Sequence, residues 1–368
     1  MLRLMKGITQ RDLARLLNVH QTTVSYILSG ARAEKFSLEM RQRVTEAAKH
    51  YGYRPSLTAR NLRGVSKTGI IGVFHFGSHK DVESFRLREV VNAIHAHNYR
   101  PLAVSMSSQI MWVPNDEKSA CSVLEEVKVE GIVLSGYADQ FDLNQLVRFH
   151  ARNVPVVSVN VELKLPGIPL FGADRYEAAY ELTSHLIANG RRKLLYLHRW
   201  PSSLVKLAKT TGFRAVEGFR AAAEDHGISP DAIRVVIQED ALTTGLNSFE
   251  SGEKGMEEGW LNGFRPDAVM CYDDSWAVGV YGWLARKGLR IPDDVAVVGF
   301  ENQEIGNHLH PRLTSVRVPY QDMSAKSIDY LVGVLQGNPT TPEMLDISKC
   351  SLVLRQSCGR NTQGDTSA

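Results

Sequence analysis

The spacing of hydrophobic positions along the chain changes near residue 68. Before that point, apolar residues recur every three or four positions in short segments, which is typical of amphipathic helices. After it, short continuous apolar runs alternate with amphipathic segments, a pattern that predicts buried parallel strands with helices on both faces of the sheet. The runs are 68–74, 101–106, 131–136, 155–160, 169–174, 193–198, 233–238, 267–273 and 295–300.

Residues 8–30 predict two short helices joined by a tight turn. Thr9 is suited to cap the first helix, Asn18 can end it in a left-handed conformation, and the second helix spans 21–28. The apolar faces are formed by Leu13, Leu16 and Leu17 in the first helix and by Val24, Ile27 and Leu28 in the second. The outward side chains of the second helix suit the reading of base edges in a DNA major groove. The alternative is a helical hairpin that only packs a core.

A third helix and a shorter fourth follow. Ser37 is suited to cap a helix over 38–51. Pro55 breaks that helix, and a short one can then run to Leu62. A helix of this length is not stable alone in water, so we expect it to fold only against a twin or on DNA. A plain linker is the alternative.

The basic side chains are concentrated in the same N-terminal part. Residues 1–64 contain 12 Lys or Arg and 4 Asp or Glu, whereas acidic side chains outnumber basic ones by five in the remainder. The net charge of +3 for the whole chain hides this division. The division favours a polyanionic partner for the N-terminal part, and beside a helix-turn-helix pattern it indicates nucleic acid.

The apolar runs fall into two sets, one ending at residue 160 and one beginning at residue 169. Helices are expected between the runs, including 177–189, 216–226 and 276–287. Two sets in series predict two similar lobes, each a doubly wound parallel sheet. Such sheets bind ligands beyond the carboxyl ends of their strands, so two facing lobes would form a ligand-binding cleft.

Length and cysteine usage place the chain among ordinary cytoplasmic proteins. A chain of 368 residues suggests two or three domains. The four cysteines form no CxxC pair, so neither a zinc site nor a disulfide framework is indicated, and we expect reduced thiols. The N-terminus does not resemble a secretory signal, and no apolar run is long enough for a membrane span. No cofactor and no metal are expected.

The ordered set of motifs resembles the lactose-repressor and galactose-repressor family of bacterial transcription regulators. TQRDLARLLNVHQTTVSYILSG is similar to that family's TIxDVAxxAGVSxxTVSRVLNG, and RQRVTEAAKHYGYRPSLTARNLR to its third helix and hinge. Further motifs follow in the family's order, including VEGIVL, FGADRYEAAYELTSHLIANGRRKLLYL, RAVEGFRAAAEDHGI, AVMCYDDSWAVGVYGWLARKGLRIPDDVAVVGFEN, HPRLTSVRVP and LVLRQSCG. The resemblance covers residues 8–358.

This resemblance implies an all-α helix-turn-helix head on an α/β body of the periplasmic-binding-protein type I fold. It implies a homodimer whose paired heads read a two-fold symmetric operator, while an effector between the lobes controls their closure. Three crossovers are expected, near Val161–Pro166, His310–Leu313 and Pro319–Gln321. The expected parts are a head (1–52), a hinge helix and linker (53–66), a two-lobed body (67–358) and a flexible tail (359–368), with lobe 1 at about 67–162 plus 313–320 and lobe 2 at about 165–310 plus 321–358.

The resemblance also assigns DNA contacts. The expected base-reading side chains are Gln21, Thr22 and Tyr26, and the expected phosphate contacts are Thr9, Thr23, Ser25 and Arg60. Leu62 matches the family's leucine wedge in the minor groove. Tyr26 stands where the family usually has an arginine, so the operator sequence should differ from the common one.

Effector contacts are expected at the carboxyl ends of strands and from aromatic side chains near them. The candidates are Phe76, Phe85, Asp174, Trp200, Arg214, Asp273, Trp276 and Glu301. Carboxylates there can bind pairs of sugar hydroxyls, and tryptophan can stack on a sugar face. The alternatives are that Asp174 and Asp274 cap the following helices and that the tryptophans lie in the core or on the surface. Two positions depart from the family: Ala215 replaces its effector-binding arginine, and Glu301 its aspartate.

Other functional classes fit less well. No GxGxxG or GxxxxGK[ST] motif follows a predicted strand, which argues against a nucleotide-dependent enzyme. A stand-alone sugar-binding protein for uptake would share the body fold, but the head and the lack of a signal sequence argue against it. The sequence therefore predicts a DNA-binding repressor with a carbohydrate effector, or alternatively a nucleobase or a partner protein as effector. The tail predicts no tetramerising helix, so a dimer is favoured.

Overall fold

The computed structural model describes residues 8–29, 32–53, 68–76, 81–106, 116–136, 149, 152–160, 166–200, 213–239, 247–341 and 344–359. The chain divides into two compact units, residues 1–68 and 69–368. The first unit is called the head and the second the body. The hinge residues Arg60 and Leu62 and the tail from residue 360 lie outside the described residues.

The head contains three helices, as the pattern predicts: α1 (Gln10–Leu17), α2 (Gln21–Ser29) and α3 (Leu38–His50), with a 3-10 turn at Ala33–Lys35. Thr9 caps α1 in a capping box with Asp12, and Asn18 ends it in the left-handed region with φ 53°. Ser37 caps α3 by accepting from the backbone N–H of Met40. These caps confirm the predicted helix boundaries to within one residue.

The core of the head is built around three fully buried side chains, Leu13, Val24 and Val44. The prediction that Leu16 joins this core is wrong, since its side chain is 55% exposed and Ala14 is buried instead. Successive helical residues are rotated by about 100°, and the buried face centres between positions 13 and 14. Leu16 lies roughly 100° from that centre.

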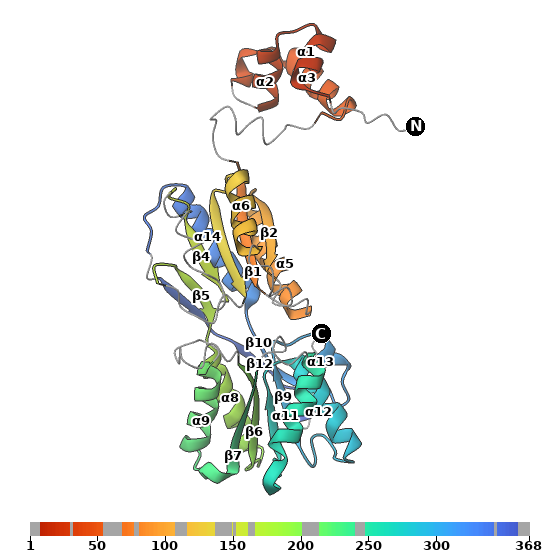
Figure 1. The fold of residues 1–368 in the computed structure, drawn as a ribbon, viewed down its shortest axis with the longest axis vertical. Helices are drawn as coiled ribbons and strands as arrows, with labels where there is room; N and C mark the ends of the chain where they lie inside the picture. The colour runs from red at the N-terminus through yellow and green to blue at the C-terminus, as the bar shows by residue number, and fades with distance from the viewer. Residues whose placement is uncertain are drawn as a thin grey trace. The chain divides into compact units, whose positions relative to one another are not determined.

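The body contains two six-stranded sheets, one in each lobe (Figure 1). The order in the first is β11-β5-β4-β3-β1-β2, and in the second β12-β10-β9-β8-β6-β7. All pairings are parallel except that of β10 with β12. The strands are β1 (Ile70–Phe76), β2 (Arg100–Met106), β3 (Gly131–Gly136), β4 (Val156–Val159), β5 (Leu170–Ala173), β6 (Leu194–Trp200), β7 (Ile233–Glu239), β8 (Ala268–Cys271), β9 (Ala296–Phe300), β10 (Thr314–Arg317), β11 (Leu345–Ser348) and β12 (Ser351–Val353).

Helices cover both faces of each sheet, as the continuous apolar strands require. In the first lobe α5 and α14 share one apolar core, and α6 packs in another. In the second lobe α8 and α9 pack on one face, and α11 and α12 on the other. The helices of the body are α5 (Asp81–Ala96), α6 (Asp116–Val127), α8 (Arg175–Ala188), α9 (Phe213–Asp225), α11 (Ser248–Gly259), α12 (Asp274–Arg286), α13 (Ile305–His308) and α14 (Tyr320–Leu335). Among the described residues, no helix combines the length and apolar character needed to cross a membrane.

The predicted division of the body into lobes needs correction. Strand β5, expected to open the second lobe, pairs with β4 in the first sheet. Strand β10, expected in the first lobe, pairs with β9 and β12 in the second. Helix α14 packs on β4 and β5, so it belongs to the first lobe.

The chain therefore passes between the lobes at three places: after β5, after β10, and between β11 and β12. The second of these, at 317–320, confirms the crossover predicted near Pro319–Gln321. Those predicted near Val161–Pro166 and His310–Leu313 are wrong, because the strands that follow them stay in the sheet they come from.

Candidate functional site

Helix α2 presents the side chains predicted to read DNA. Its apolar face is buried through Val24 and Ile27, while Thr22 and Tyr26 are exposed. Gln21, Thr23 and Ser25 on the same helix are half-buried. The helix therefore has one side that packs on the head core and one that is open to a partner.

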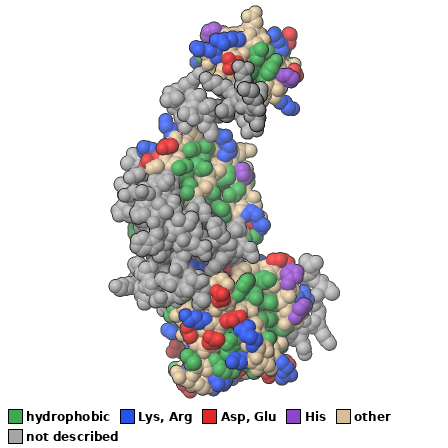
Figure 2. Space-filling model, turned by 45° about the vertical axis from the view of Figure 1, so that its right-hand side comes forward, with side chains coloured by type: hydrophobic (Ala, Val, Ile, Leu, Met, Phe, Trp, Pro, Cys, Tyr) green, Lys and Arg blue, Asp and Glu red, His purple; other side chains and the backbone are tan. Residues whose placement is uncertain are grey.

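Local contacts hold some of these side chains. The Oγ1 atom of Thr22 lies 2.8 Å from Nδ1 of His20 in the preceding turn. The guanidinium of Arg32 lies over the Tyr26 ring, 5.6 Å from its centroid. Thr9 is exposed, and its hydroxyl donates to the Asp12 carboxylate at 2.6 Å. That bond lowers the pKa of Asp12. Lys and Arg side chains are prominent on the head in Figure 2, whereas both signs of charge mix on the second lobe.

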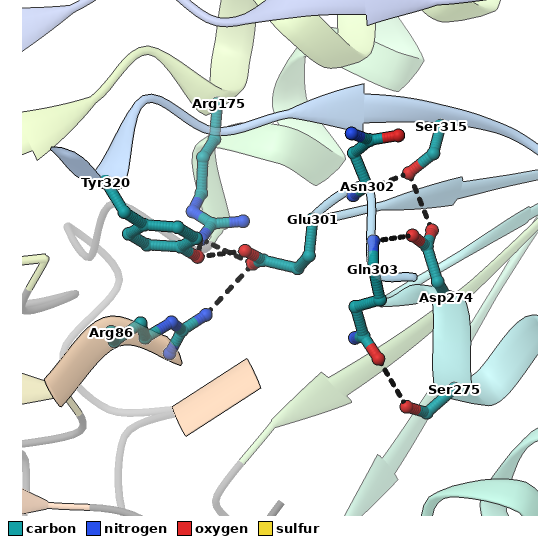
Figure 3. Close-up of polar contacts among 9 residues, drawn as sticks. All are labelled: Arg86, Arg175, Asp274, Ser275, Glu301, Asn302, Gln303, Ser315 and Tyr320. Carbon is teal, nitrogen blue, oxygen red and sulfur yellow. Dashed lines mark hydrogen bonds and ion pairs between the residues drawn. The ribbon is translucent and has the colours of Figure 1, made fainter. Parts of the chain in front are cut away.

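A second cluster of polar side chains joins the two lobes of the body (Figure 3). Glu301, directly after β9, accepts from Nη2 of Arg86 and from Nη2 of Arg175 at its Oε1, each at 2.9 Å. The Tyr320 hydroxyl donates to Oε2 of the same carboxylate. Arg86 and Tyr320 belong to first-lobe helices α5 and α14, whereas Glu301 and Arg175 belong to the second lobe. We call these four residues the junction cluster.

Because the junction cluster is buried, its charged groups interact strongly with one another. The side chains of Arg86 and Glu301 are each 3% exposed. Burial alone would raise the pKa of Glu301, but the two guanidiniums and the Tyr320 hydroxyl outweigh it and bring the pKa down to about 2. Burial raises the pKa of the Tyr320 phenol well above its usual range. Glu301 is therefore a carboxylate and Tyr320 a neutral donor at neutral pH.

His75, near the carboxyl end of β1, is a further buried group close to Arg86. Burial and the charge of Arg86 lower its pKa to about 4, so its ring is neutral. Its Nδ1 atom has no hydrogen-bond partner among the described residues.

Asp274 anchors the segment that carries Glu301. It is fully buried at the first position of α12. Its Oδ2 accepts from the backbone N–H of Gln303 at 2.6 Å, and its Oδ1 from the Ser315 hydroxyl at 2.6 Å. Burial raises its pKa despite these bonds. The carboxyl group thus ties α12 to the segment after β9 and to β10.

Two of the predicted strand-end acids, Asp174 and Asp273, serve as helix caps. Asp174 accepts from the backbone N–H of Glu177 at the start of α8, which confirms the capping alternative for this residue. At α12 the cap is Asp273, which accepts from the N–H of Trp276 at 2.9 Å, and the expected cap Asp274 is already helical. Asp273 has the extended backbone of an N-cap, with φ −147°.

The remaining effector candidates are scattered. Phe85 is 39% exposed, and its ring lies 6.0 Å from that of Tyr320 in an edge contact. Trp276 is 1% exposed and lies in the core of the second lobe. This confirms the alternative prediction for this residue, a core position rather than stacking on a sugar. Arg214 is exposed, with its guanidinium over the Tyr176 ring, and Ala215 is buried. The side chains of Phe76 and Trp200 lie outside the described residues.

Sequence reasoning missed three of the four residues of the junction cluster. Arg175 directly follows a strand-end aspartate, so the same rule that selects Asp174 could have selected it. Arg86 lies in the second turn of α5 and Tyr320 at the first position of α14, and only the packing of α5 against α14 brings them together.

Comparisons with known proteins agree with this architecture. A helix-turn-helix family model matches residues 1–35, and a periplasmic binding protein-like domain model matches residues 183–358. The HTH-type transcriptional regulator GntR of Escherichia coli K12 is 26% identical over 338 residues, 92% of this chain and 95% of that protein. The HTH-type transcriptional repressor PurR of Histophilus somni is 25% identical over 95% of this chain and 98% of its own length.

Solved structures show the same fold. A lac repressor dimer bound to operator and an anti-inducer is 20% identical, with a TM-score of 0.76 over 96% of this chain and 99% of that one. A complex of the transcriptional regulator CelR with cellobiose is 22% identical, with a TM-score of 0.67 over 95% of this chain and 99% of that one.

Proposed function

Because the chain belongs to the lactose-repressor and galactose-repressor family of DNA-binding transcription regulators, we propose that it is a repressor controlled by a sugar bound between the lobes. The observation that carries the proposal is helix α2, which buries Val24 and Ile27 and leaves a polar side open. Such a helix in a basic head is built for a major groove. The two curated relatives described above are both named as transcription regulators, and neither is named as an enzyme.

Gln21, Thr22 and Tyr26 would contact base edges. Thr9, Thr23, Ser25 and Arg60 would contact phosphates and set the register of the head on the duplex. Leu62 would enter the minor groove from the hinge. With two heads in a dimer, the operator would be two-fold symmetric.

Gln21→Ala tests the base-reading role. The operator is first selected from a random DNA library by the wild-type protein. The variant is expected to lose about 1–3 kcal/mol on that operator and to relax the preference at one base pair per half-site, because only the base contact is removed. Arg60→Ala is the control, since loss of a phosphate contact should weaken binding to all sequences alike. Equal losses by Gln21→Ala on operator and scrambled DNA would refute the assignment.

The assembly is proposed to be a homodimer. The second lobe exposes Phe249 on α11 and Ile305 on α13, both large apolar side chains that a partner surface could cover. Sedimentation equilibrium of the full chain should give the mass of two copies at micromolar concentration. A monomer at concentrations where operator binding is complete would contradict the proposal.

The effector would bind between the lobes, next to the junction cluster, where strands β1, β3, β8 and β9 end. Since Glu301 contacts groups of both lobes, a ligand beside it can change how the lobes close. Calorimetric titration of the full chain with neutral sugars, sugar acids, sugar phosphates and purines tests this. Binding of sugars with a change in operator affinity supports the proposal, and binding of purines alone replaces the sugar by a nucleobase.

A further inference from the structure

The junction cluster has the geometry of an anion-binding site in which the carboxylate of Glu301 takes the place of a bound anion. Guanidiniums from opposite lobes, those of Arg86 and Arg175, donate to the same oxygen of Glu301 at 2.9 Å each. The Tyr320 hydroxyl donates to the other oxygen (Figure 3). Two guanidiniums and a phenol around one carboxylate are the donors that proteins use to bind carboxylate and phosphate ligands.

The donors are held in place by groups other than Glu301. The Arg86 guanidinium lies over the Tyr320 ring, 5.0 Å from its centroid, and Phe85 packs its edge against the same ring. Arg175 is positioned by the start of α8, which Asp174 caps. An incoming anion would thus meet donors already arranged for it, which lowers the cost of binding.

The acceptor, in contrast, is held in an unfavourable backbone conformation. Glu301 has φ 92°, and the next residue, Asn302, has φ 48°. Residues other than glycine and asparagine rarely adopt such values, and the strain persists only where the surrounding contacts enforce it. A ligand that replaces the Glu301 carboxylate would free this segment to relax.

The other carboxyl groups near the junction cluster have their own partners. Asp174 and Asp273 cap α8 and α12. Asp274 is occupied by Gln303 and Ser315. His75 is a neutral ring beside Arg86. Among these groups, Glu301 is the one whose carboxylate accepts hydrogen bonds from both guanidiniums.

We propose that Arg86, Arg175 and Tyr320 bind the anionic group of the effector, a carboxylate or a phosphate, and that Glu301 occupies their site until the ligand displaces it. This inference rests on the proposed function and narrows its ligand class. It also accounts for Ala215: guanidiniums at positions 86 and 175 supply the contact that the family arginine would make. Displacement of Glu301 would remove its contacts with Arg86 and Tyr320, which couples ligand binding to lobe closure.

The first experiment uses Glu301→Gln in the full chain, which keeps the size of the side chain and removes its charge. In a chloride buffer this variant is expected to melt at a lower temperature than wild type, because the guanidiniums lose their carboxylate. Acetate or inorganic phosphate, added at constant ionic strength, should restore the melting temperature. The apparent affinity for the rescuing anion should be at least about tenfold higher than in wild type, as expected for charge-assisted hydrogen bonds without an internal competitor.

Acetate and phosphate separate the two ligand chemistries, since the anion that rescues better identifies the group the effector carries. Asp294→Asn is the matched control, because it removes a carboxylate from the exposed pair with Arg290, 3.1 Å apart. That variant should show no rescue. If Glu301→Gln does not fold, Glu301→Ser takes its place: its short neutral side chain also removes the internal carboxylate, and the same rescue is expected. The same response to anions in wild type, control and variant would overturn the proposal.

A second experiment separates this inference from the proposed function. Glucuronate and glucose 6-phosphate are compared with glucose in titrations of wild type, Arg86→Gln and Arg175→Gln, with operator affinity as a second readout. The anionic ligands should bind the wild type more tightly than glucose, and each substitution should cost them about tenfold or more and glucose little. If glucose shifts the operator affinity and both arginine substitutions leave its binding unchanged, the proposed anion site is wrong, while the proposed repressor function still holds. If the protein binds no DNA, the proposed repressor function is wrong, while the anion-rescue result remains a valid test of the anion site.

Discussion

Gly279→Ala is expected to lower the free energy of unfolding by about 3 kcal/mol. Gly279 lies on α12 where that helix crosses α11, and a Cβ atom there would collide with the carbonyl oxygen of Phe249. Gly252 on α11 is placed in the same way against the carbonyl of Trp276. The two helices therefore approach backbone to backbone, and neither obstacle is a side chain that can turn away.

Gly282→Ala, three residues further along the same helix, is the control. Its nearest neighbours would be Nη1 of Arg286 at 3.4 Å and Oε1 of Glu253 at 3.5 Å, both ends of flexible side chains. Alanine there should stabilise the chain by roughly 0.5–1 kcal/mol, the usual gain over glycine inside a helix. Urea unfolding of both variants measures the difference. Similar midpoints for the two would show that the close approach of α11 and α12 is not what requires glycine.

Asp274→Ala is expected to destabilise the body by about 3 kcal/mol, because it leaves the N–H of Gln303 and the hydroxyl of Ser315 without their acceptor. Asp274→Asn should cost less than about 1.5 kcal/mol. Its amide oxygen can accept from Gln303, its amide nitrogen can donate to Ser315, and it is neutral where burial disfavours charge.

Thermal unfolding of the two variants checks this ranking. Asp274→Ala should also tighten the binding of an anionic ligand at the junction cluster, because the segment from Glu301 to Gln303 loses its anchor and the ligand displaces the Glu301 carboxylate more easily. Equal destabilisation by asparagine and alanine would show that the charge of Asp274, rather than its two hydrogen bonds, stabilises the segment.

Local patterns proved reliable for the elements themselves. Each of the nine apolar runs became a strand, and the caps at Thr9 and Ser37 start helices where expected. The capping alternative for Asp174 held for the same reason, because an acid directly before a helix can bond to the first free N–H groups whatever the rest of the fold does. Such features depend on neighbours within four residues.

Assignment of strands to lobes failed where it depended on distant partners. The run PLFGAD resembles the other buried runs, and nothing within it shows that Ser158 and Val159 will pair with Leu170 and Phe171. Likewise, β10 is placed in the second lobe by β9 and by the antiparallel partner β12, a short half-exposed strand with no recognisable alternation.

By itself, therefore, the sequence determined the three head helices, nine of the twelve described strands, the basic helix-turn-helix head and the family resemblance, because hydrophobic period, capping and charge are local properties. Only the tertiary structure decided the junction cluster. Glu301 meets Arg175 across 126 positions and Arg86 across 215. The cluster forms because two separate sheets bring the second turn of α5 and the starts of α8 and α14 to the end of β9, and no spacing within one segment encodes that meeting.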